Sequence, residues 1–529
     1  MAEPKHDTDL LVIGGGINGV AIARDAAGRG LRVHLVEMDD LAQSTTSPST
    51  NQYHGGLRYR EYYEVRLVRE SLIERETLLK AMPHISWPMR FVLPFHPDMR
   101  FDTETPTSRL MSRVMPWMKG RRPAWLIRLG LFLYDSLGGR EILPGTRTLD
   151  LRTSPEGAPL KSKFAHAYEY SDAWVEDSRL VVLTARDAQS RGAVIETRAK
   201  VISADRLADG WTVHVENRAK GEMQTLTAKA LVNAGGPWVG DVIHGALRLN
   251  SSENVRLVQG SHIVTRRLFD HEKCYFFQGT DGRIIFAIPY ETDYTLIGTT
   301  DRDYEGDPSD VTCSDAEKDY LCNFASQYFE RPVTRDDVVW SFSGVRPLYD
   351  DGATSATAAT RDYVLSLDTA GAPVLNVFGG KITTHRRLAE HAVDKLKEVF
   401  PEITAPWTAG VSLPGGDFQV AEKPALIAKL RADYPFLEDA EAIRLIKAYG
   451  TEAPDVLGEA TERSDLGRVF GATLAEREVL WLMDREYAQT AADVVWRRSK
   501  LGLRMTAEEI EALDSFMAAR RAPQPEEAA

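Results

Sequence analysis

Three glycines near the N-terminus have the spacing of a phosphate-binding turn. Gly14, Gly16 and Gly19 form G-x-G-x-x-G after the apolar run at 10–13, and a helical apolar pattern follows. Gly14 permits a tight turn, Gly16 lets backbone N–H groups approach a pyrophosphate, and Gly19 lets the helix pack closely on the strand. Glu37 ends the next predicted strand and can bind a ribose diol. An ordinary β-α-β unit with glycine-rich turns is the alternative, but this context predicts a site for the ADP half of NAD or FAD.

A loop rich in hydroxyl groups follows Glu37. Its hydroxyl residues are Ser44, Thr45, Thr46, Ser47, Ser49 and Thr50, and HGGLRY follows at 54–59. The hydroxyl groups can bond to a pyrophosphate, and Gly55 and Gly56 allow close approach to a flat ring. Arg58 and Tyr59 lie beside these glycines. We therefore favour a functional loop over a plain surface loop.

Two later segments combine a short strand with glycines. LVNAGGPW at 231–238 is an apolar strand that breaks into small residues, at the place where a flavin-binding domain returns a second strand to the dinucleotide. The strand predicted at 374–377 leads into Gly379, Gly380 and Lys381, which open a helix. A glycine pair at such a junction is typical of a site for an anion or a ring edge.

His262 and Arg346 are single residues with weaker signals. His262 lies in the first strand of a predicted antiparallel sheet, where a lone histidine is more often structural. Arg346 lies in WSFSGVRPL at 340–348, where we predict a turn before Pro347, and a lone arginine is usually a surface charge. Residue type alone assigns neither of them a role.

The stretch 105–134 is strongly basic. It contains six arginine and lysine residues, no acidic residue, and interleaved methionines and tryptophans, in a chain of net charge −13. This composition suits the headgroup layer of an anionic membrane. A helical hairpin with solvated arginines, or a subunit contact, explains it equally well.

The chain that carries these residues has 529 residues, and a chain of this length favours two to four domains. The negative charge argues against a nucleic-acid-binding protein. Three cysteines without C-x-x-C spacing make a disulfide framework or a zinc or other metal site unlikely on this pattern, and a reducing compartment fits. The polar N-terminus predicts no signal peptide, and no apolar run is long enough to span a bilayer.

Hydrophobic periodicity divides the chain into three kinds of region. We predict an amphipathic helix at 64–82, and open-sheet strands at 194–197, 211–215 and 231–233. The region 245–345 has the alternation of an antiparallel sheet that faces the substrate. The region 422–520 is almost purely helical. Its segments lie near 423–432, 439–449, 474–488, 490–500 and 507–520, with a capping box at Thr506 and Glu509.

The motifs GGGINGVAIARDAAGRGLRVHLVE, HGGLRY, LVNAGGPW, GSHIV, SGVRPL, TRDY and FGGKITT occur in this order. In that order they resemble the FAD-dependent glycerol-3-phosphate dehydrogenase family, over residues 9 to about 503. The resemblance implies an α/β FAD-binding domain of the glutathione-reductase type 2, an antiparallel substrate domain and an all-α C-terminal domain. The expected boundaries are about 7–65, 160–240 and 346–400 for FAD binding, 66–159 and 241–345 for the substrate or cap region, and 401–529 for the helical domain.

The resemblance implies oxidation of sn-glycerol 3-phosphate at C2 to dihydroxyacetone phosphate, with electrons passing from FAD to a membrane quinone. It also implies a homodimer on the cytoplasmic face of the membrane. The residues that it places around the flavin face are Arg58, Tyr59, His262, Arg346, Arg361 and Lys381. Our hypothesis gives phosphate and the reacting oxygen to Arg346 and Arg361, the base role to His262, and an effect on reduced flavin to Lys381. These roles can be permuted.

The cofactor-binding set that we predict is Gly14, Gly15, Gly16, Asn18, Gly19, Glu37, Thr45, Thr46, Ser47, Ser49, Gly55, Gly56, Gly235, Trp238, Gly379, Gly380, Lys381 and Thr383. Three positions depart from the family pattern. Asn51 replaces a lysine, Tyr53 replaces an aliphatic residue and His385 replaces a tyrosine. Residues 101–120 resemble an insertion, so no membrane contact is transferred to them by resemblance.

Four other readings compete with a quinone-linked dehydrogenase. A glycerol-3-phosphate oxidase would pass electrons to O₂, and an amino-acid oxidase would need one carboxylate clamp instead of a cationic cluster for a dianion. A flavin-binding redox sensor would bind FAD without turnover. An NAD dehydrogenase is disfavoured because the dinucleotide domain continues at Leu231 and Phe378, as it does in flavoproteins of this type.

Overall fold

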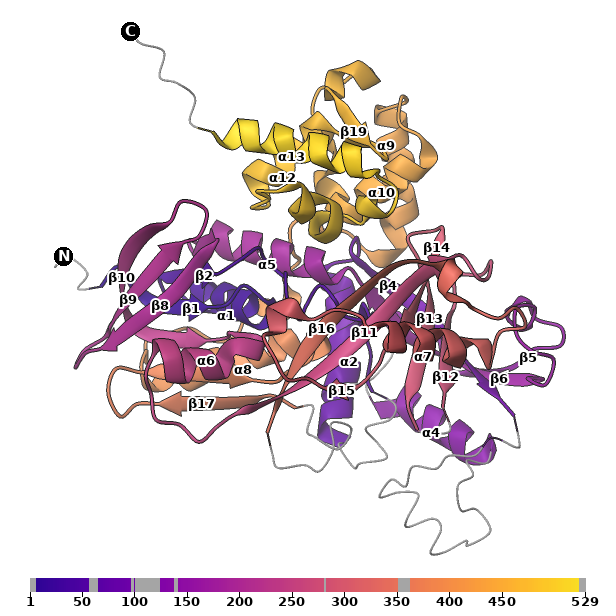
Figure 1. Ribbon diagram of the computed structural model, residues 1–529, viewed down its shortest axis with the longest axis horizontal. Coiled ribbons are helices and arrows are strands. Elements are labelled where there is room, and N and C mark those ends of the chain that lie inside the picture. The colour runs from indigo at the N-terminus through magenta and orange to yellow at the C-terminus, as the bar shows by residue number, and fades with distance from the viewer. Residues whose placement is uncertain are drawn as a thin grey trace, which may run out of the picture.

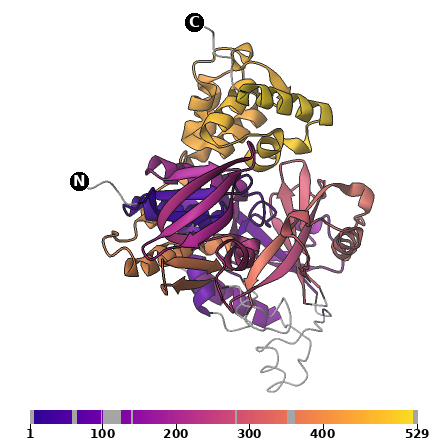
Figure 2. The ribbon, with the colours of Figure 1, turned by 60° about the vertical axis from the view of Figure 1, so that its left-hand side comes forward.

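Two sheets and a helical domain make up the computed structural model of this chain (Figure 1). The structure describes residues 6–56, 65–96, 99, 124–137, 141–279, 282–350 and 362–522. The two sheets lie side by side, and the C-terminal helices lie against both of them at one end (Figure 2).

The first sheet contains the strands that the dinucleotide motif predicts. Its parallel strands, in spatial order, are β18 (Val374–Phe378), β10 (Glu222–Asn233), β1 (Thr8–Ile13), β2 (Val33–Glu37) and β7 (Val194–Thr197). β17 (Val364–Asp368) pairs antiparallel with β18, and β8 (Ala199–Arg206) and β9 (Trp211–Asn217) extend antiparallel from β10. Because β1 lies between β2 and β10, the loops after these strands meet at one edge of the sheet.

Both faces of this sheet are covered, which explains the continuous apolar run in β1. Leu10 and Val12 pack toward α1 (Ile17–Gly28), α5 (Asp177–Ser190) and α8 (His385–Lys395). Leu11 and Ile13 pack instead with the inward residues of β8 and β9, including Trp211. The helix α1 therefore begins directly after β1 and lies over the sheet, with its N-terminus at the edge where the loops meet.

The second sheet is mixed and has ten strands. Its main path is β15 (Arg302–Asp303), β11 (Val255–Arg266), β14 (Tyr294–Gly298), β13 (Ile284–Tyr290), β12 (Cys274–Gln278), β4 (Ser86–Phe95), β6 (His166–Val175) and β3 (Gln52–Tyr53). β16 (Val338–Tyr349) pairs with β11, and β5 (Arg147–Asp150) pairs with β6. The helix α7 (Asp315–Ser326) packs on one face, and α2 (Val65–Ala81) and α4 (Ala124–Leu137) pack on the other.

The C-terminal domain has its own apolar core. Its helices are α9 (Lys423–Asp433), α10 (Asp439–Tyr449), α11 (Ala453–Leu457), α12 (Glu476–Arg485) and α13 (Ala507–Arg521), with the hairpin β19 (Val469–Gly471) and β20 (Leu474–Ala475) before α12. The short helix α6 (Val239–Asp241) is not part of this domain and follows β10 of the first sheet along the chain. The predicted capping box at Thr506 and Glu509 is present.

Buried ion pairs attach this domain to the first sheet. Arg498 donates to both carboxylate oxygens of Asp40, at 2.5 and 2.8 Å, in the loop that follows β2. Arg198 pairs with Asp493 at 2.9 Å in the same region. Removing one partner of a buried pair leaves an uncompensated charge, so these contacts fix the position of the loop after Glu37.

Two local expectations differ from the structure. Arg346, which we placed in a turn, lies inside β16, where it is opposite Val258 of β11. β16 pairs with β11 alone among the described strands, and an edge strand tolerates Pro347. The segment 166–175, which falls within the expected FAD-binding range 160–240, is the strand β6 of the second sheet. β3 at 52–53, within the expected range 7–65, belongs to that sheet too.

Candidate dinucleotide and substrate site

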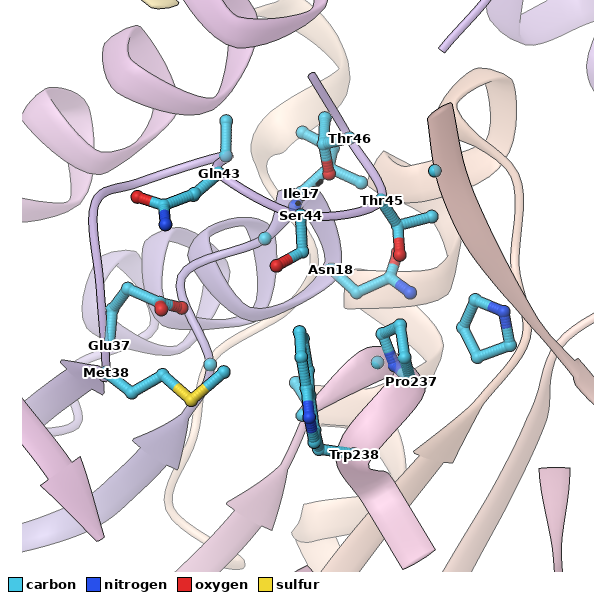
Figure 3. A pocket seen from close by; sticks show the side chains of 18 of the residues that line it. Ile17, Asn18, Glu37, Met38, Gln43, Ser44, Thr45, Thr46, Pro237 and Trp238 are labelled. Carbon is cyan, nitrogen blue, oxygen red and sulfur yellow. Dashed lines mark hydrogen bonds between the residues drawn. The ribbon is translucent and has the colours of Figure 1, made fainter. Parts of the chain in front are cut away.

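A cavity of about 1010 Å³ lies where the loops after β1, β2, β10 and β18 meet. It continues to β11 and β16 of the second sheet, so one cavity touches both sheets. Its volume is at the upper end of the range for ligand pockets. Figure 3 shows part of its lining, with Glu37 and Met38 at one end and Asn18, Thr45 and Pro237 toward the other.

The glycines after β1 differ in what surrounds them. Gly14 has φ +111°, and a Cβ there would lie 2.5 Å from the carbonyl oxygen of Ala234. A Cβ at Gly19 would lie 1.9 Å from the carbonyl oxygen of Gly14, so the close packing of helix on strand requires this glycine. At Gly16 the nearest atom is Thr46 Oγ1 at 3.7 Å. The space over Gly16 therefore belongs to the cavity, as a cradle for a pyrophosphate requires.

Replacing Gly16 with valine is expected to abolish FAD binding while the protein stays folded. The added side chain fills the cradle and meets no crowded protein atoms, since only Thr46 lies within 4 Å of the new Cβ. The check is the flavin absorbance of the purified variant together with its far-UV circular dichroism and melting temperature. Gly410→Ala, where a Cβ meets nothing within 4 Å, is the control and should keep its flavin. Full flavin content in the Gly16 variant would contradict the assignment.

Glu37 lies at the far end of this cavity from the second sheet. Its Oε2 accepts a hydrogen bond from the Gly15 N–H at 2.5 Å, and its Oε1 accepts one from the Asp39 N–H at 2.9 Å. Burial raises the pKa of the Glu37 carboxyl to about 7, against the opposing effect of these two N–H groups. Each oxygen keeps a second lone pair for a ribose hydroxyl.

The affinity for FAD is expected to rise as the pH increases from 5.5 to 7 and to level off above that. Ribose hydroxyls that donate to Glu37 favour the ionised form of its carboxyl. In the protein without FAD, the raised pKa of about 7 keeps this carboxyl protonated at lower pH. The dependence is at most about tenfold per pH unit. Titration of the apoprotein with FAD at several pH values measures it. The same slope in Glu37→Gln would contradict this explanation.

The hydroxyl-rich loop contributes in two different ways. Thr45, Thr46 and Ser49 line the cavity. Thr46 Oγ1 accepts the Ile17 N–H at 3.4 Å, which ties the loop to the start of α1. Ser49 Oγ donates to Asp177 at 2.7 Å, at the start of α5. Ser47 does not line the cavity and instead bonds to the hydroxyl of Ser178, so it positions the loop.

The segments after β10 and β18 complete the cofactor end. Gly235 and Trp238 line the cavity, as do Gly379, Gly380 and Lys381. Asn18 Nδ2 donates to the Gly379 carbonyl at 3.1 Å, which joins two segments that are 361 residues apart in the sequence. The predicted segments therefore come together at one site.

Six residues of the predicted cofactor set do not line the cavity: Gly15, Gly19, Ser47, Gly55, Gly56 and Thr383. Thr383 is buried and its hydroxyl accepts the His54 N–H at 3.3 Å. Gly55 lies against the helices of the second sheet, because a Cβ there would lie 2.4 Å from Leu72 and 2.7 Å from the Tyr134 hydroxyl. Gly56 does not line the cavity either. The close approach that we expected toward a flat ring is, at Gly55, an approach to α2 and α4.

Arg346 lies at the other end of the cavity. Its guanidinium donates to Asp301 Oδ1 at 2.9 Å and to Thr299 Oγ1 at 3.1 Å. The side chain crosses over Gly260, where a Cβ would lie 2.3 Å from a guanidinium nitrogen. The glycine in β11 therefore makes room for the arginine, and the two acceptors fix its orientation. A planar, oriented guanidinium is suited to a phosphate or carboxylate.

His262 lies behind the cavity wall. The residue is 1% exposed. Its ring stacks on Phe342 at a centroid distance of 4.9 Å and contacts Thr50 Oγ1 through Nε2 at 2.9 Å. Burial, and then the nearby charge of Arg346, lower the pKa of His262 to about 3. Thr50 itself lines the cavity. The imidazole is therefore neutral and reaches the cavity through the threonine hydroxyl.

Comparison with known families decides which dinucleotide this cavity holds. The model for "FAD dependent oxidoreductase" matches residues 9–386, and the model for the "C-terminal domain of alpha-glycerophosphate oxidase" matches residues 406–521. The chain belongs to the FAD-dependent oxidoreductase family. Its cofactor is FAD, the predicted fold class is confirmed, and the open cradle at Gly16 and the paired acceptors of Glu37 fit the ADP half of that cofactor.

This FAD-dependent oxidoreductase is similar along most of its length to several named dehydrogenases. It is 51% identical to a D-erythritol 1-phosphate dehydrogenase of Brucella abortus, over 96% of this chain and 97% of that one. It is 43% identical to the aerobic glycerol-3-phosphate dehydrogenase of Escherichia coli, over 95% of each chain. The crystal structure of the Bacillus halodurans glycerol-3-phosphate dehydrogenase with FAD matches with a TM-score of 0.73 at 26% identity, covering 98% and 91%.

Some site residues of this oxidoreductase were predicted and others were missed. Arg58, Tyr59 and Arg361 lie outside the described residues. The cavity wall also includes Gln52 and His54, which we did not predict as ligands. Asn51, between Thr50 and Gln52, has φ +56°, so this segment is not a continuous extended strand and no simple alternation in the sequence points to these residues.

Proposed function

We propose that this enzyme oxidises sn-glycerol 3-phosphate at C2 to dihydroxyacetone phosphate and passes the electrons to a membrane quinone. The observation that carries the proposal is Arg346, held by Asp301 and Thr299 at the end of the FAD cavity that lies beside the Thr50–His262 pair. The names of the Escherichia coli and Bacillus halodurans relatives support the same substrate.

FAD supplies the acceptor for the hydride that leaves C2. Arg346 binds the substrate phosphate through charge-assisted hydrogen bonds and orients the carbon chain. The proton of the C2 hydroxyl moves to the hydroxyl of Thr50, whose own proton passes to the neutral Nε2 of His262. Lys381, which lines the same cavity, places a positive charge near the cofactor. Arg58, Tyr59 and Arg361 remain members of the proposed set on the family resemblance.

Anaerobic addition of glycerol 3-phosphate to the purified protein tests the proposal. Bleaching of the flavin absorbance, followed by recovery when a quinone analogue is added, is the expected result. Absence of bleaching would overturn the proposed reaction. Peroxide formation in air without quinone would assign O₂ as the acceptor, and bleaching by an amino acid alone would assign an amino-acid oxidase.

D-Erythritol 1-phosphate is a second candidate substrate. The relative of that name is 51% identical over nearly the full length of both chains. Both substrates are alcohols that carry a phosphate, so the same arginine can bind either of them. The same anaerobic assay with each phosphate separates the two: the better substrate gives the higher kcat/KM for flavin reduction.

We also propose that α4 contacts the membrane that holds the quinone. Trp125, Leu129, Phe132 and Leu133 are exposed, and their spacing places them on one face of the helix. Arg128 lies on the same helix, and α4 lies at the end of the molecule opposite the C-terminal domain (Figure 1). No helix in the described part of the chain could cross a bilayer.

The basic residues at 105–123 lie outside the described residues. The proposed location is the cytoplasmic face of the membrane, with the chain as a homodimer.

Replacing Phe132 with glutamate is expected to weaken binding to anionic lipid vesicles by about tenfold or more. The change removes the most exposed apolar side chain of α4, which is 62% exposed, and adds a like charge at the lipid surface. Vesicle sedimentation measures it, and activity with a soluble acceptor should be unchanged. Met223→Glu, at an exposed methionine on β10, is the matched control. Equal vesicle binding by both variants would contradict the role of α4.

A further inference from the structure

A row of packed rings leads from His262 to the C-terminal domain. The His262 imidazole stacks on Phe342 with ring centroids 4.9 Å apart, and the Phe342 ring lies 4.8 Å from the ring of Trp340. Trp340 stacks in turn on Trp496 at 4.7 Å, with 19° between the two planes. His262 is buried, and the other three residues are half-buried. This ring row therefore connects a residue behind the cavity wall to a separate domain.

Strand pairing fixes the first part of the ring row. In the antiparallel pair of β11 and β16, Phe342 lies directly opposite His262, and Trp340 lies opposite Val264. Side chains of directly opposite residues share one face of a sheet, as do alternate residues of one strand. Among the described strands β16 pairs with β11 alone, so strand pairing holds it along one side only. The stacking of Trp340 on Trp496 adds a contact to β16 from another domain.

The helical turn that carries Trp496 is fixed to the cofactor-binding sheet. Trp496 lies in the π-helical turn Asp493–Arg498, and the last residue of this turn donates to both carboxylate oxygens of Asp40 in the loop after β2. The indole of Trp496 also packs on the backbone at Gly502, where a Cβ would lie 2.7 Å from the indole. The ring row therefore ends on an indole whose position is set by both the first sheet and the C-terminal domain.

The imidazole of His262 has few other contacts that set its orientation. Its Nε2 lies 2.9 Å from Thr50 Oγ1, and the proposed proton path uses this contact. No group in the described part of the chain forms a hydrogen bond with its Nδ1. On the neighbouring strand β14 it faces Gly298, where a Cβ would lie 2.0 Å from His262 Cδ2. A general base is commonly oriented by a hydrogen bond to a third group, whereas here the ring orientation depends on packing against Phe342.

We propose that Trp496 is a positioning residue, through which the C-terminal domain holds the Phe342–His262 stack and keeps the imidazole aligned with Thr50. This inference rests on the proposed function, because it needs His262 as the proton acceptor. Trp496 does not line the cavity, so its effect should appear in the rate of flavin reduction and not in substrate binding. The hydrogen bonds that orient Arg346 do not involve the ring row.

Replacing Trp496 with leucine tests the inference on the intact holoenzyme, since leucine keeps an apolar contact and removes the ring. The limiting rate of anaerobic flavin reduction by glycerol 3-phosphate is expected to fall about 10- to 100-fold, because misplacing a catalytic group by a small distance has an effect of this size. The glycerol 3-phosphate concentration that gives half of the limiting rate should stay within about threefold of the wild type. Trp496→Phe, which restores a stacking ring, should recover most of the rate.

The double variant Trp496→Leu/His262→Ala separates positioning from general damage to the fold. If Trp496 acts through the imidazole, the double variant should reduce its flavin as fast as His262→Ala does. A further loss of about tenfold or more in the double variant would overturn the inference. An unchanged limiting rate in Trp496→Leu with normal flavin content would also overturn it, while leaving the reaction intact. Absence of bleaching by glycerol 3-phosphate in the wild type would instead overturn the proposed function.

Trp481→Leu is the matched control. This half-buried indole belongs to the same domain and contacts the guanidinium groups of Arg186 and Arg485, outside the ring row. Its limiting rate should match the wild type, and a loss equal to that of Trp496→Leu would overturn the inference. Flavin content and melting temperature are measured for every variant. If Trp496→Leu does not retain its flavin, Trp340→Leu interrupts the ring row at the next ring and makes the same test.

Discussion

Flavin reduction by glycerol 3-phosphate is expected to slow by about 10²- to 10⁴-fold when His262 is replaced with alanine. In the proposed mechanism the imidazole accepts the proton that leaves the reacting hydroxyl by way of Thr50, whose Oγ1 lies 2.9 Å from Nε2. Stopped-flow bleaching under anaerobic conditions measures the rate. The flavin content of the variant must be measured in parallel, because the ring also stacks on Phe342.

The pH profile separates this role from that of an ordinary surface histidine. Burial and the charge of Arg346 lower the pKa of His262 to about 3, so the ring is already neutral throughout the working range. The kcat/KM for flavin reduction should therefore show no inflection near pH 6.5 that belongs to this residue. Thr50→Val should reproduce most of the loss, and the double variant should lose little more, since the two groups act as one path.

His271→Ala is the control, because that histidine lies in the loop between β11 and β12 and its ring bonds to the Tyr275 hydroxyl outside the cavity. Its rate of flavin reduction should match the wild type. A rate within about threefold of the wild type in His262→Ala, with full flavin content, would contradict the proton path through Thr50 to His262 and would require another group as the acceptor.

Replacing Arg346 with methionine is expected to lower kcat/KM for glycerol 3-phosphate by about 10- to 100-fold, mainly through KM. The change removes the charge-assisted hydrogen bonds that we propose between Arg346 and the phosphate, and it keeps most of the side-chain volume. FAD affinity should stay close to that of the wild type, because the ADP half binds at the other end of the cavity. Steady-state kinetics and FAD titration measure both quantities.

Arg256→Met provides the matched control for Arg346. Arg256 lies on β11, pairs with Asp303 at 2.7 Å, and does not line the cavity, so it offers the same chemistry outside the site. Arg346→Lys should recover only part of the activity. A planar guanidinium can donate to Asp301, Thr299 and a phosphate at once, and a lysine ammonium cannot reproduce this geometry. Wild-type KM in Arg346→Met would contradict phosphate binding by this residue.

The cofactor half of the site could be predicted because its signals are local. Gly14, Gly16, Gly19 and Glu37 occur within one β-α-β unit, and the packing of each glycine follows from the turn between strand and helix. The same holds for α9, α10 and α13, where periodicity and the cap at Thr506 predicted the limits within a few residues. The short helix α11 and the hairpin of β19 and β20 were not predicted.

The substrate half depends on strand pairing between distant segments, and the sequence does not encode that pairing locally. Arg346 followed by proline resembles a turn, yet β16 pairs with a strand about 90 residues earlier. Gly55 resembles a ring-binding glycine, but its close neighbours are Leu72 on α2 and Tyr134 on α4. Gln52 has no local pattern at all, because its burial depends on β6 and on Cys274 of β12.

The scattered origin of the FAD cavity has a consequence for biosynthesis. The Asn18 amide meets the Gly379 carbonyl, and Thr45 Oγ1 donates to the Val345 carbonyl at 2.7 Å, so the cofactor site closes only when residues from both halves of the chain are present. During translation the glycine turn emerges from the ribosome more than 300 residues before its partners. A nascent chain that stops before residue 379 lacks part of the FAD site, and we therefore expect the cofactor to bind after most of the polypeptide has been made.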